Sequence, residues 1–158
     1  MSDHKQVEIY SQVFEQNIEV DEGIAELIEL LGKLDIMTNN SCQENKPGIM
    51  WIDLPSVDAE RFLSICASHR AEDLDNYENS LYGRMVDDDT KNSWRYDVCL
   101  DDFAEKVDEE KDEVYYEGNS EISIEISVRF PVSDYPIILE RIREHLESLN
   151  VATPNAEE

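Results

Sequence analysis

One polar stretch of this 158-residue chain carries the side chains best suited to chemistry. It runs from Asn39 to Gly48 and reads Asn-Asn-Ser-Cys-Gln-Glu-Asn-Lys-Pro-Gly. Amide and hydroxyl groups both donate and accept hydrogen bonds, so they can read a nucleobase edge, a ribose or a peptide. Asn and Ser also dominate turns for local backbone reasons. The pattern predicts a loop between two strands that either binds a polar ligand or only turns the chain. The candidate binding residues are Asn40, Ser41, Cys42, Gln43, Asn45 and Trp51.

A catalytic role for Cys42 needs a neighbouring base or positive charge that stabilises the thiolate. The candidates are His69 and His145, both distant in sequence, and the nearby Lys46. Negative charge around a thiol works against its activation, and a partly buried structural cysteine is the commoner case. We therefore assign no catalytic residue.

Metal and cofactor signatures are missing from the sequence. There is no Cys-x-x-Cys, no His-x-x-x-His and no EF-hand loop, and the acidic run from Asp87 to Asp89 is typical of a solvated turn. Phosphate-binding, dinucleotide-binding and serine-hydrolase motifs are absent as well. We expect no metal, no cofactor and a non-enzymatic role.

The chain is strongly acidic, with 38 Asp and Glu against 13 Lys and Arg and a formal net charge of -25. Such a surface excludes nucleic acid as a direct partner and disfavours anionic membranes. It favours cations and basic partner surfaces. Residues 71–121 hold 18 acidic and 5 basic residues, a net charge of -13, so the middle of the chain carries about half of the excess.

Location is inferred from three observations. The first residues are polar rather than an apolar leader, and no apolar run approaches the roughly 20 residues that span a bilayer. The three cysteines are Cys42, Cys66 and Cys99, an odd and widely spaced set that is not a disulfide framework. We expect a cytoplasmic protein.

Hydrophobic periodicity places the elements around the polar stretch. A helix is expected from Asp21 to Leu34, strands at 36–38 and 48–54, and a second helix after Pro55. The charge run 101–112 is expected to be a loop or a short surface helix. Further strands are expected at 94–100 and 122–130, with a hairpin turn at Gly118-Asn119. A last helix covers 135–149, and residues 151–158 are expected to be a disordered tail.

Two units share the pattern of a strand, a proline and a helix. Leu54-Pro55-Ser56 and Phe130-Pro131-Val132 fall at the same place in residues 17–70 and 94–149, with an acidic insert at 71–93. This predicts one α+β domain over residues 1–150, with an antiparallel sheet and helices on one face. One arrangement that fits the pattern is two ferredoxin-like strand-strand-helix halves. An alternative is that such junctions are simply common.

Trp51 is expected on the sheet face opposite the helices. A large aromatic side chain there needs a cover, which could be a ligand, a second subunit or the segment 70–93. A homodimer is therefore possible, although the folded-over segment is the simpler arrangement.

Residues 21–65 resemble a group of small bacterial and phage proteins of unknown function. The shared pattern is Thr38, Ser41-Cys42-Gln43, Pro47-Gly48, Trp51-Ile52 and the helix Ala59-Glu60-Arg61-Phe62-Leu63. The resemblance implies that the polar stretch is the feature common to that group, and it implies no activity.

Two functions remain open. The first is a non-enzymatic binding protein with a polar loop pocket around Cys42 for a small polar ligand or a partner segment. The alternative is an acidic interaction protein or inhibitor, which occupies a basic, nucleic-acid-type surface of a partner protein.

Overall fold

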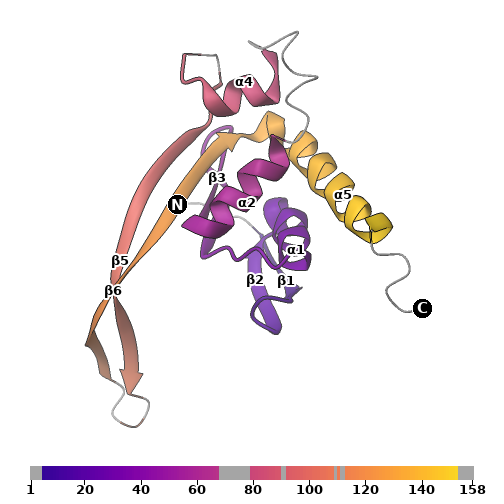
Figure 1. Cartoon of the computed structure of the whole chain (residues 1–158). Coiled ribbons are helices and arrows are strands. Elements are labelled where there is room, and N and C mark those ends of the chain that lie inside the picture. Colours follow the sequence, from indigo (N-terminus) through magenta and orange to yellow (C-terminus); the bar gives the residue numbers. More distant parts are fainter. Residues whose placement is uncertain (1–4, 68–78, 90–91, 109, 111–112, 153–158) are drawn as a thin grey trace.

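The computed structural model describes residues 5–67, 79–89, 92–108, 110 and 113–152, and for 44–46, 101–108, 113–121 and 151–152 it describes the backbone alone. The predicted α+β class is confirmed: helices pack on an antiparallel sheet (Figure 1).

The N-terminal part is a hairpin followed by a helix. Strands β1 (Gln6–Ser11) and β2 (Gln16–Asp21) pair antiparallel, and the 3-10 turn η1 (Glu22–Ile24) leads into α1 (Ala25–Lys33). The predicted helix is thus confirmed, and a two-stranded hairpin precedes it. Val7 and Ile9 alternate with polar residues, which is the pattern of a half-buried strand.

The second part holds the four-stranded sheet. Its strands are β3 (Asn40–Lys46), β4 (Ile49–Pro55), β5 (Arg95–Asp108) and β6 (Glu113–Pro131), in the spatial order β3-β4-β6-β5. All pairs are antiparallel. The helices are α2 (Ser56–Cys66), the short α4 (Leu81–Val86) and α5 (Tyr135–Ala152), which follows the turn η3 (Val132–Asp134).

Two strand-strand-helix units make up this part, β3-β4-α2 and β5-β6-α5. Strands β4 and β5 run parallel with β6 between them, which is the split βαβ arrangement of ferredoxin-like folds. The edge strand β3 is the first of the four sheet strands in chain order, whereas the strand at this edge comes last in a ferredoxin-like fold. At the centre of the sheet Ile52 pairs with Val128, two residues that the expected repeat also equates.

The core lies between the sheet and the helices. Along β4 the burial alternates, so that Met50, Ile52 and Leu54 are buried on the helix side. Opposite them lie Phe62 of α2 and Ile138 of α5, both fully buried. Apolar residues at every second strand position and at helical spacing explain why these two layers meet.

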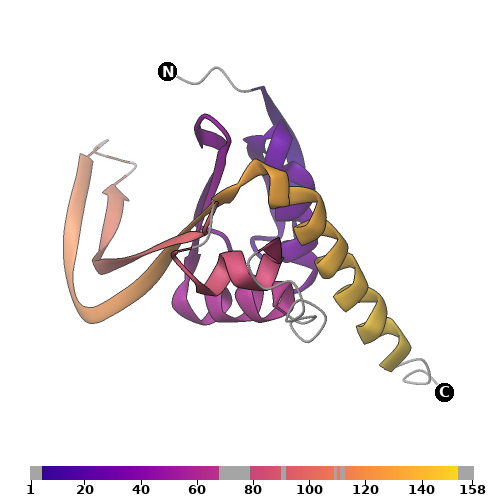
Figure 2. The same cartoon turned by 90° about the horizontal axis from the view of Figure 1, so that it is seen from above.

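The strands β5 and β6 form a long arm that projects away from the body of the protein (Figure 2). Two predictions were wrong here. Residues 101–108, expected as a loop or short helix, continue β5, and Gly118 lies within β6 opposite Phe103 instead of in a turn. The chain reverses between Asp108 and Glu113. Pairing with β5 keeps Gly118 in a strand despite its turn propensity. A register shift between Asp101 and Phe103 takes up the extra residues of β6 at this point.

Two further expectations differ from the structure. The polar stretch 39–47 is mostly strand β3 rather than a loop. The described part of the insert 71–93 contributes Leu81 and Met85 to the core on the helix side, so it does not fold over Trp51. At the C-terminus α5 extends through Ala152, and the expected tail from residue 153 lies outside the described residues.

Candidate functional site

Strand β3 is an edge strand that ends in a tight turn at Pro47-Gly48. Gly48 has φ +79°, a left-handed conformation that glycine adopts without a Cβ penalty, so the predicted turn is confirmed. Ser41 pairs with the buried Ile52 and shares its helix-side face. Asn40 and Cys42 pair with Asp53 and Trp51 on the other face. The sequence neighbours Ser41 and Cys42 therefore serve opposite sides of the sheet.

Gln43 is engaged in holding the chain together. Its side-chain Oε1 accepts a hydrogen bond from the backbone N–H of Gly23 at 2.7 Å. Its own backbone N–H donates to Asp21 Oδ2 at 3.0 Å. The Gln6 amide also donates to Asp21, whose side chain is buried. Gln43 thus ties β3 to the start of α1, which is a structural role.

Trp51 is covered by an arginine. The guanidinium of Arg129 lies 6.0 Å from the indole centroid, and the indole Nε1 donates to Ser127 Oγ at 2.5 Å. Arg129 is in turn paired with Asp97 at 2.8 Å. Side chains of β6 therefore supply the cover that Trp51 requires, and Cys42 lies half-buried beside it.

A pocket of about 310 Å³ lies between β2 and β3. Of the six predicted binding residues, Asn40 and Ser41 line it, while Cys42, Gln43 and Trp51 do not. The side chain of Asn45 lies outside the described residues. The pocket combines apolar and polar walls, and its lining residues are Gln6, Phe14, Ile18, Glu19, Val20, Asp21, Thr38, Asn39, Asn40 and Ser41.

The polar groups of this pocket are partly held in place by neighbours. Asn40 Oδ1 accepts from the Ser41 N–H at 2.9 Å, and the Asn39 amide donates to Glu125. Among the described lining residues the charged ones are Glu19 and Asp21, and none is a Lys or an Arg. The pocket therefore suits a neutral or positively charged ligand and not an anion.

A larger, shallower groove of about 550 Å³ lies between α2 and α4. Its walls are Ala59, Leu63 and Met85 among others, and its floor is formed by Tyr96 of β5 and Ile126 of β6. Glu60 is the single charged residue of the described lining, which consists of Ser56, Ala59, Glu60, Leu63, Ser64, Ala67, Met85, Val86, Tyr96 and Ile126. Sequence reasoning missed this groove, because α4 fell in a segment without periodicity.

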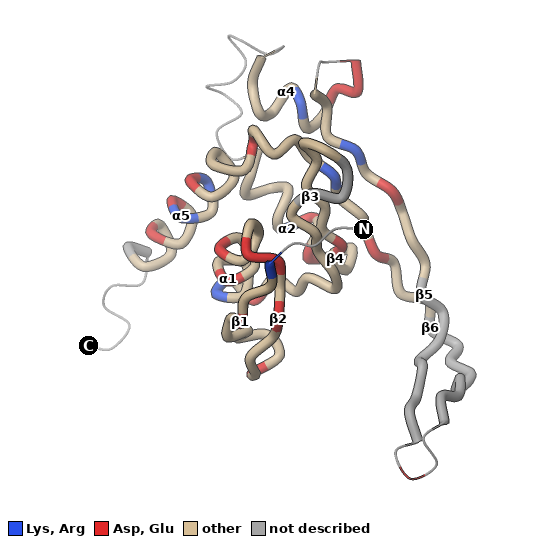
Figure 3. The backbone as a smooth tube through the Cα atoms, turned by 180° about the vertical axis from the view of Figure 1, so that it is seen from behind, with Lys and Arg blue, Asp and Glu red and all other residues tan. Residues whose placement is uncertain are grey.

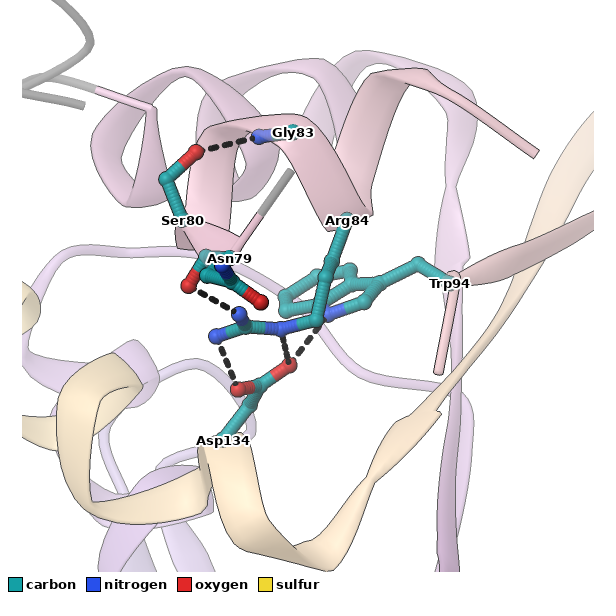
Figure 4. Close-up of polar contacts among 6 residues, drawn as sticks. All are labelled: Asn79, Ser80, Gly83, Arg84, Trp94 and Asp134. Atoms are coloured by element: carbon teal, nitrogen blue, oxygen red, sulfur yellow. Dashed lines mark hydrogen bonds and ion pairs between the residues drawn. The ribbon is translucent and has the colours of Figure 1, made fainter. Parts of the chain in front are cut away.

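The short helix α4 is held by a buried ion pair (Figure 4). Asp134 is 2% exposed and accepts from Arg84 Nη2 at 2.6 Å and Nε at 3.1 Å, and from Trp94 Nε1 at 2.9 Å. Ser80 Oγ caps the helix by accepting from the Gly83 N–H at 2.9 Å. Both carboxylate oxygens are satisfied, so this cluster fixes one wall of the groove instead of forming a reactive site.

The groups beneath the groove are uncharged at neutral pH. Tyr96 donates its hydroxyl hydrogen to the Met85 carbonyl at 2.7 Å. Burial raises the pKa of the Tyr96 phenol, and burial likewise raises the pKa of the Cys66 thiol. The described lining is thus mainly apolar surface, with Glu60 as its one charged residue.

The acidic turn that follows α4 holds the carboxylate oxygens of Asp87, Asp88 and Asp89 within 4.8 Å of one another. Asp87 Oδ1 accepts from the Asp89 N–H at 2.9 Å, as in an Asx turn. Asp88 and Asp89 are exposed to solvent. The arrangement agrees with the solvated turn expected from the sequence.

Comparisons with known proteins found one similarity across most of the chain. An uncharacterised protein of Acanthamoeba polyphaga mimivirus is 28% identical over 154 residues, which cover 93% of this chain and 73% of the viral protein. No family model matches the sequence, and no solved structure matches the fold. Among the described residues, no helix is long and apolar enough to cross a membrane. The chain is similar to a giant-virus protein of unassigned function.

Proposed function

We propose that this protein is a non-enzymatic binding protein that takes a small polar ligand in the pocket between β2 and β3. The observation that carries the proposal is that Asn40 and Ser41, singled out by residue type, line a pocket of about 310 Å³. That volume is at the lower end of the range for small-molecule sites. The pocket is more enclosed than the groove between α2 and α4, as a small ligand requires.

The lining selects the chemical class of ligand. Amide and hydroxyl groups of Gln6, Thr38 and Asn40 can pair with donors and acceptors alike. Phe14 and Ile18 offer apolar surface to a flat or aliphatic body. Because the charged lining residues are acidic, a nucleoside or an organic amine fits, and the corresponding phosphate does not.

Ligand titrations followed by NMR of the backbone amides test the proposal, with adenosine, a polyamine and adenosine monophosphate as probes. We expect adenosine or the polyamine to shift the amide signals of residues 38–41 and the monophosphate to leave them in place. Ser41→Leu fills the pocket and should abolish the shifts. Cys42→Leu makes the same kind of change one residue along, on the opposite face, and should keep them. The binding proposal would be falsified if no probe shifted the amide signals, or if both variants lost the ligand-induced shifts equally.

A second candidate is the acidic interaction protein, and the groove between α2 and α4 favours it. An open apolar groove on a molecule with a formal net charge of -25 is a surface for a protein segment and not for a small molecule. The cytoplasmic location and a homodimer stay predictions from the sequence.

A further inference from the structure

The groove between α2 and α4 continues onto the arm as one uninterrupted apolar surface. Tyr96 and Ile126 form the groove floor, and alternate residues of the same two strands extend the same sheet face. These side chains are large and strongly exposed: 70% for Val98, 66% for Leu100, 63% for Ile122 and 46% for Ile124. We call the groove together with these four residues the apolar face.

The apolar face is the part of the helix side that lacks a helix. Over β4 and the end of β6, α2 and α5 cover the sheet and bury Ile52 and Val128 completely. On the arm Val98 and Leu100 are strongly exposed. Within the described residues, no helix lies over the arm formed by β5 and β6 (Figure 2). A sheet face of this kind is normally completed by another helix. The row from Tyr96 to Leu100 alone extends about 13 Å, close to the length of nine residues of helix.

The rim of the apolar face is acidic. Glu60 lies on the α2 wall of the groove, and Val86 lies on the α4 wall. The acidic turn of residues 87–89 directly follows α4 and is red in Figure 3. No Lys or Arg is among the described lining residues of the groove. Arg84 of α4 is neutralised by Asp134. Cationic side chains placed on both flanks of an apolar stripe would therefore be complementary to this surface.

We propose that the apolar face docks a basic amphipathic α-helix of a partner protein. The apolar stripe of the helix packs into the groove and along Val98 and Leu100. Its Lys and Arg residues face Glu60 on one flank and the turn 87–89 on the other. A second copy of this chain is disfavoured as the occupant, because two molecules of formal net charge -25 repel each other. The proposal is independent of the polar pocket, which lies between β2 and β3.

The test uses three synthetic peptides of about 18 residues, long enough for five helical turns. One is a Leu/Lys amphipathic helix, the second has the same composition in scrambled order, and the third replaces Lys by Glu. Fluorescence anisotropy measures their affinities for the full chain, and NMR shifts map the contacts. We expect the amphipathic basic peptide to bind at least about tenfold more tightly than the scrambled one, and the acidic peptide not to bind.

Two pairs of variants assign the interaction to the apolar face. The double variant Val98→Ser/Leu100→Ser should lower the affinity for the basic amphipathic peptide at least about tenfold, because it removes exposed apolar side chains without opening the core. The control variant Val132→Ser/Leu149→Ser also changes one Val and one Leu. These residues are 37% and 46% exposed and lie outside the apolar face, so the affinity should stay unchanged. Asp88→Asn/Asp89→Asn should weaken binding several-fold at low salt, whereas Glu8→Gln/Glu15→Gln should not.

Three outcomes overturn the proposal. One is binding of the scrambled peptide as tight as that of the amphipathic peptide, which would mean simple charge attraction. Another is an unchanged affinity in Val98→Ser/Leu100→Ser, which would place the contact elsewhere. The third is a dimer in sedimentation analysis that the same double variant converts to monomer, which would assign the apolar face to a second copy.

Discussion

Gly23 and Gln43 form a contact that ties strand β3 to the start of α1. A Cβ on Gly23 would lie 2.6 Å from Gln43 Oε1 and 3.1 Å from Gln43 Cβ. We therefore expect Gly23→Ala to displace the Gln43 side chain, break its bond to the Gly23 N–H and lower the free energy of unfolding by about 1–2 kcal/mol. Urea denaturation measures the change.

Gly32 provides the matched control in the same segment. A Cβ there would meet only the Gln12 backbone nitrogen at 3.7 Å, an ordinary contact, and the residue lies inside α1. Gly32→Ala should raise the free energy of unfolding by about 0.5–1 kcal/mol, since alanine is the better helix former. If both variants change stability in the same direction, the contact with Gln43 does not explain the effect at Gly23.

The Cys66 thiol gives a pH dependence whose sign is fixed by its burial. Burial raises the pKa of the thiol above its ordinary value of 9.0 in the folded chain. Below about pH 9 the Cys66 thiol keeps its proton in the folded and in the unfolded chain. Above that pH the unfolded chain releases the proton first, so the free energy of unfolding falls as the pH rises. Denaturation between pH 8 and about 10.5 should show a shallower loss in Cys66→Ala than in the wild type.

Cys99→Ala is the control for this measurement, because Cys99 is exposed. It should retain the wild-type slope. A Cys66→Ala variant with the same slope as the wild type would show that other groups, such as Tyr96, carry the alkaline loss of stability.

At the residue scale the sequence indicated which segment to inspect, but not what each side chain does. Asn40 and Ser41 line a pocket, whereas Gln43 is used in a structural contact and Cys42 shares a face with Trp51. The stretch expected to be one loop is an edge strand, and its first two residues line the pocket whereas Gln43 is bonded to the start of α1. The Gly23–Gln43 hydrogen bond joins residues that are 20 positions apart, so a local sequence pattern does not predict it.

At the element scale one buried carboxylate helps to hold the short helix α4 in place. Six residues are too few to be stable as an isolated helix, so α4 is held by the burial of Leu81 and Met85, by the ion pair of its Arg84 with Asp134 and by the Ser80 cap. We expect Asp134→Asn to cost about 3 kcal/mol, because it leaves a guanidinium without its charge partner at a buried site. The isosteric Asp97→Asn, at a pair whose carboxylate is 67% exposed, should cost less than about 1 kcal/mol.

Hydrogen exchange distinguishes loss of α4 from general destabilisation. Asp134→Asn should speed exchange of the amides of 81–86 more than those of β4. Equal costs in the two Asp→Asn variants would contradict the central role of Asp134.

The elements of the core were predictable where side-chain periodicity decides them. The helices at 25–33, 56–66 and 135–152 and the strand at 49–55 follow the expected apolar positions. The arm was not predictable, because Gly118 and Asn119 have turn propensity, whereas both lie in β6 and Gly118 pairs with Phe103 of β5. The bounds of α4 were not predictable either, because the helix has only Leu81 and Met85 as buried apolar side chains and a salt bridge to the distant Asp134 helps to hold it.

At the scale of the whole molecule the formal net charge of -25 opposes compaction. Salt screens this repulsion over about 10 Å at 0.1 M and less at higher concentration. We expect the free energy of unfolding by urea to rise when NaCl is increased from about 0.02 to 0.5 M. A constant or falling stability would mean that the surface carboxylates are already compensated locally.

The pairing of Ile52 with Val128 at the centre of the sheet has an evolutionary consequence. Around this pair the two strand-strand-helix units face each other through equivalent strands, as subunits do in an isologous dimer. A protein that once assembled from two identical chains would, after tandem fusion of its gene, show this arrangement. On such an origin, the hairpin and α1 would be an addition to the first half, and the arm a lengthening of the strands of the second.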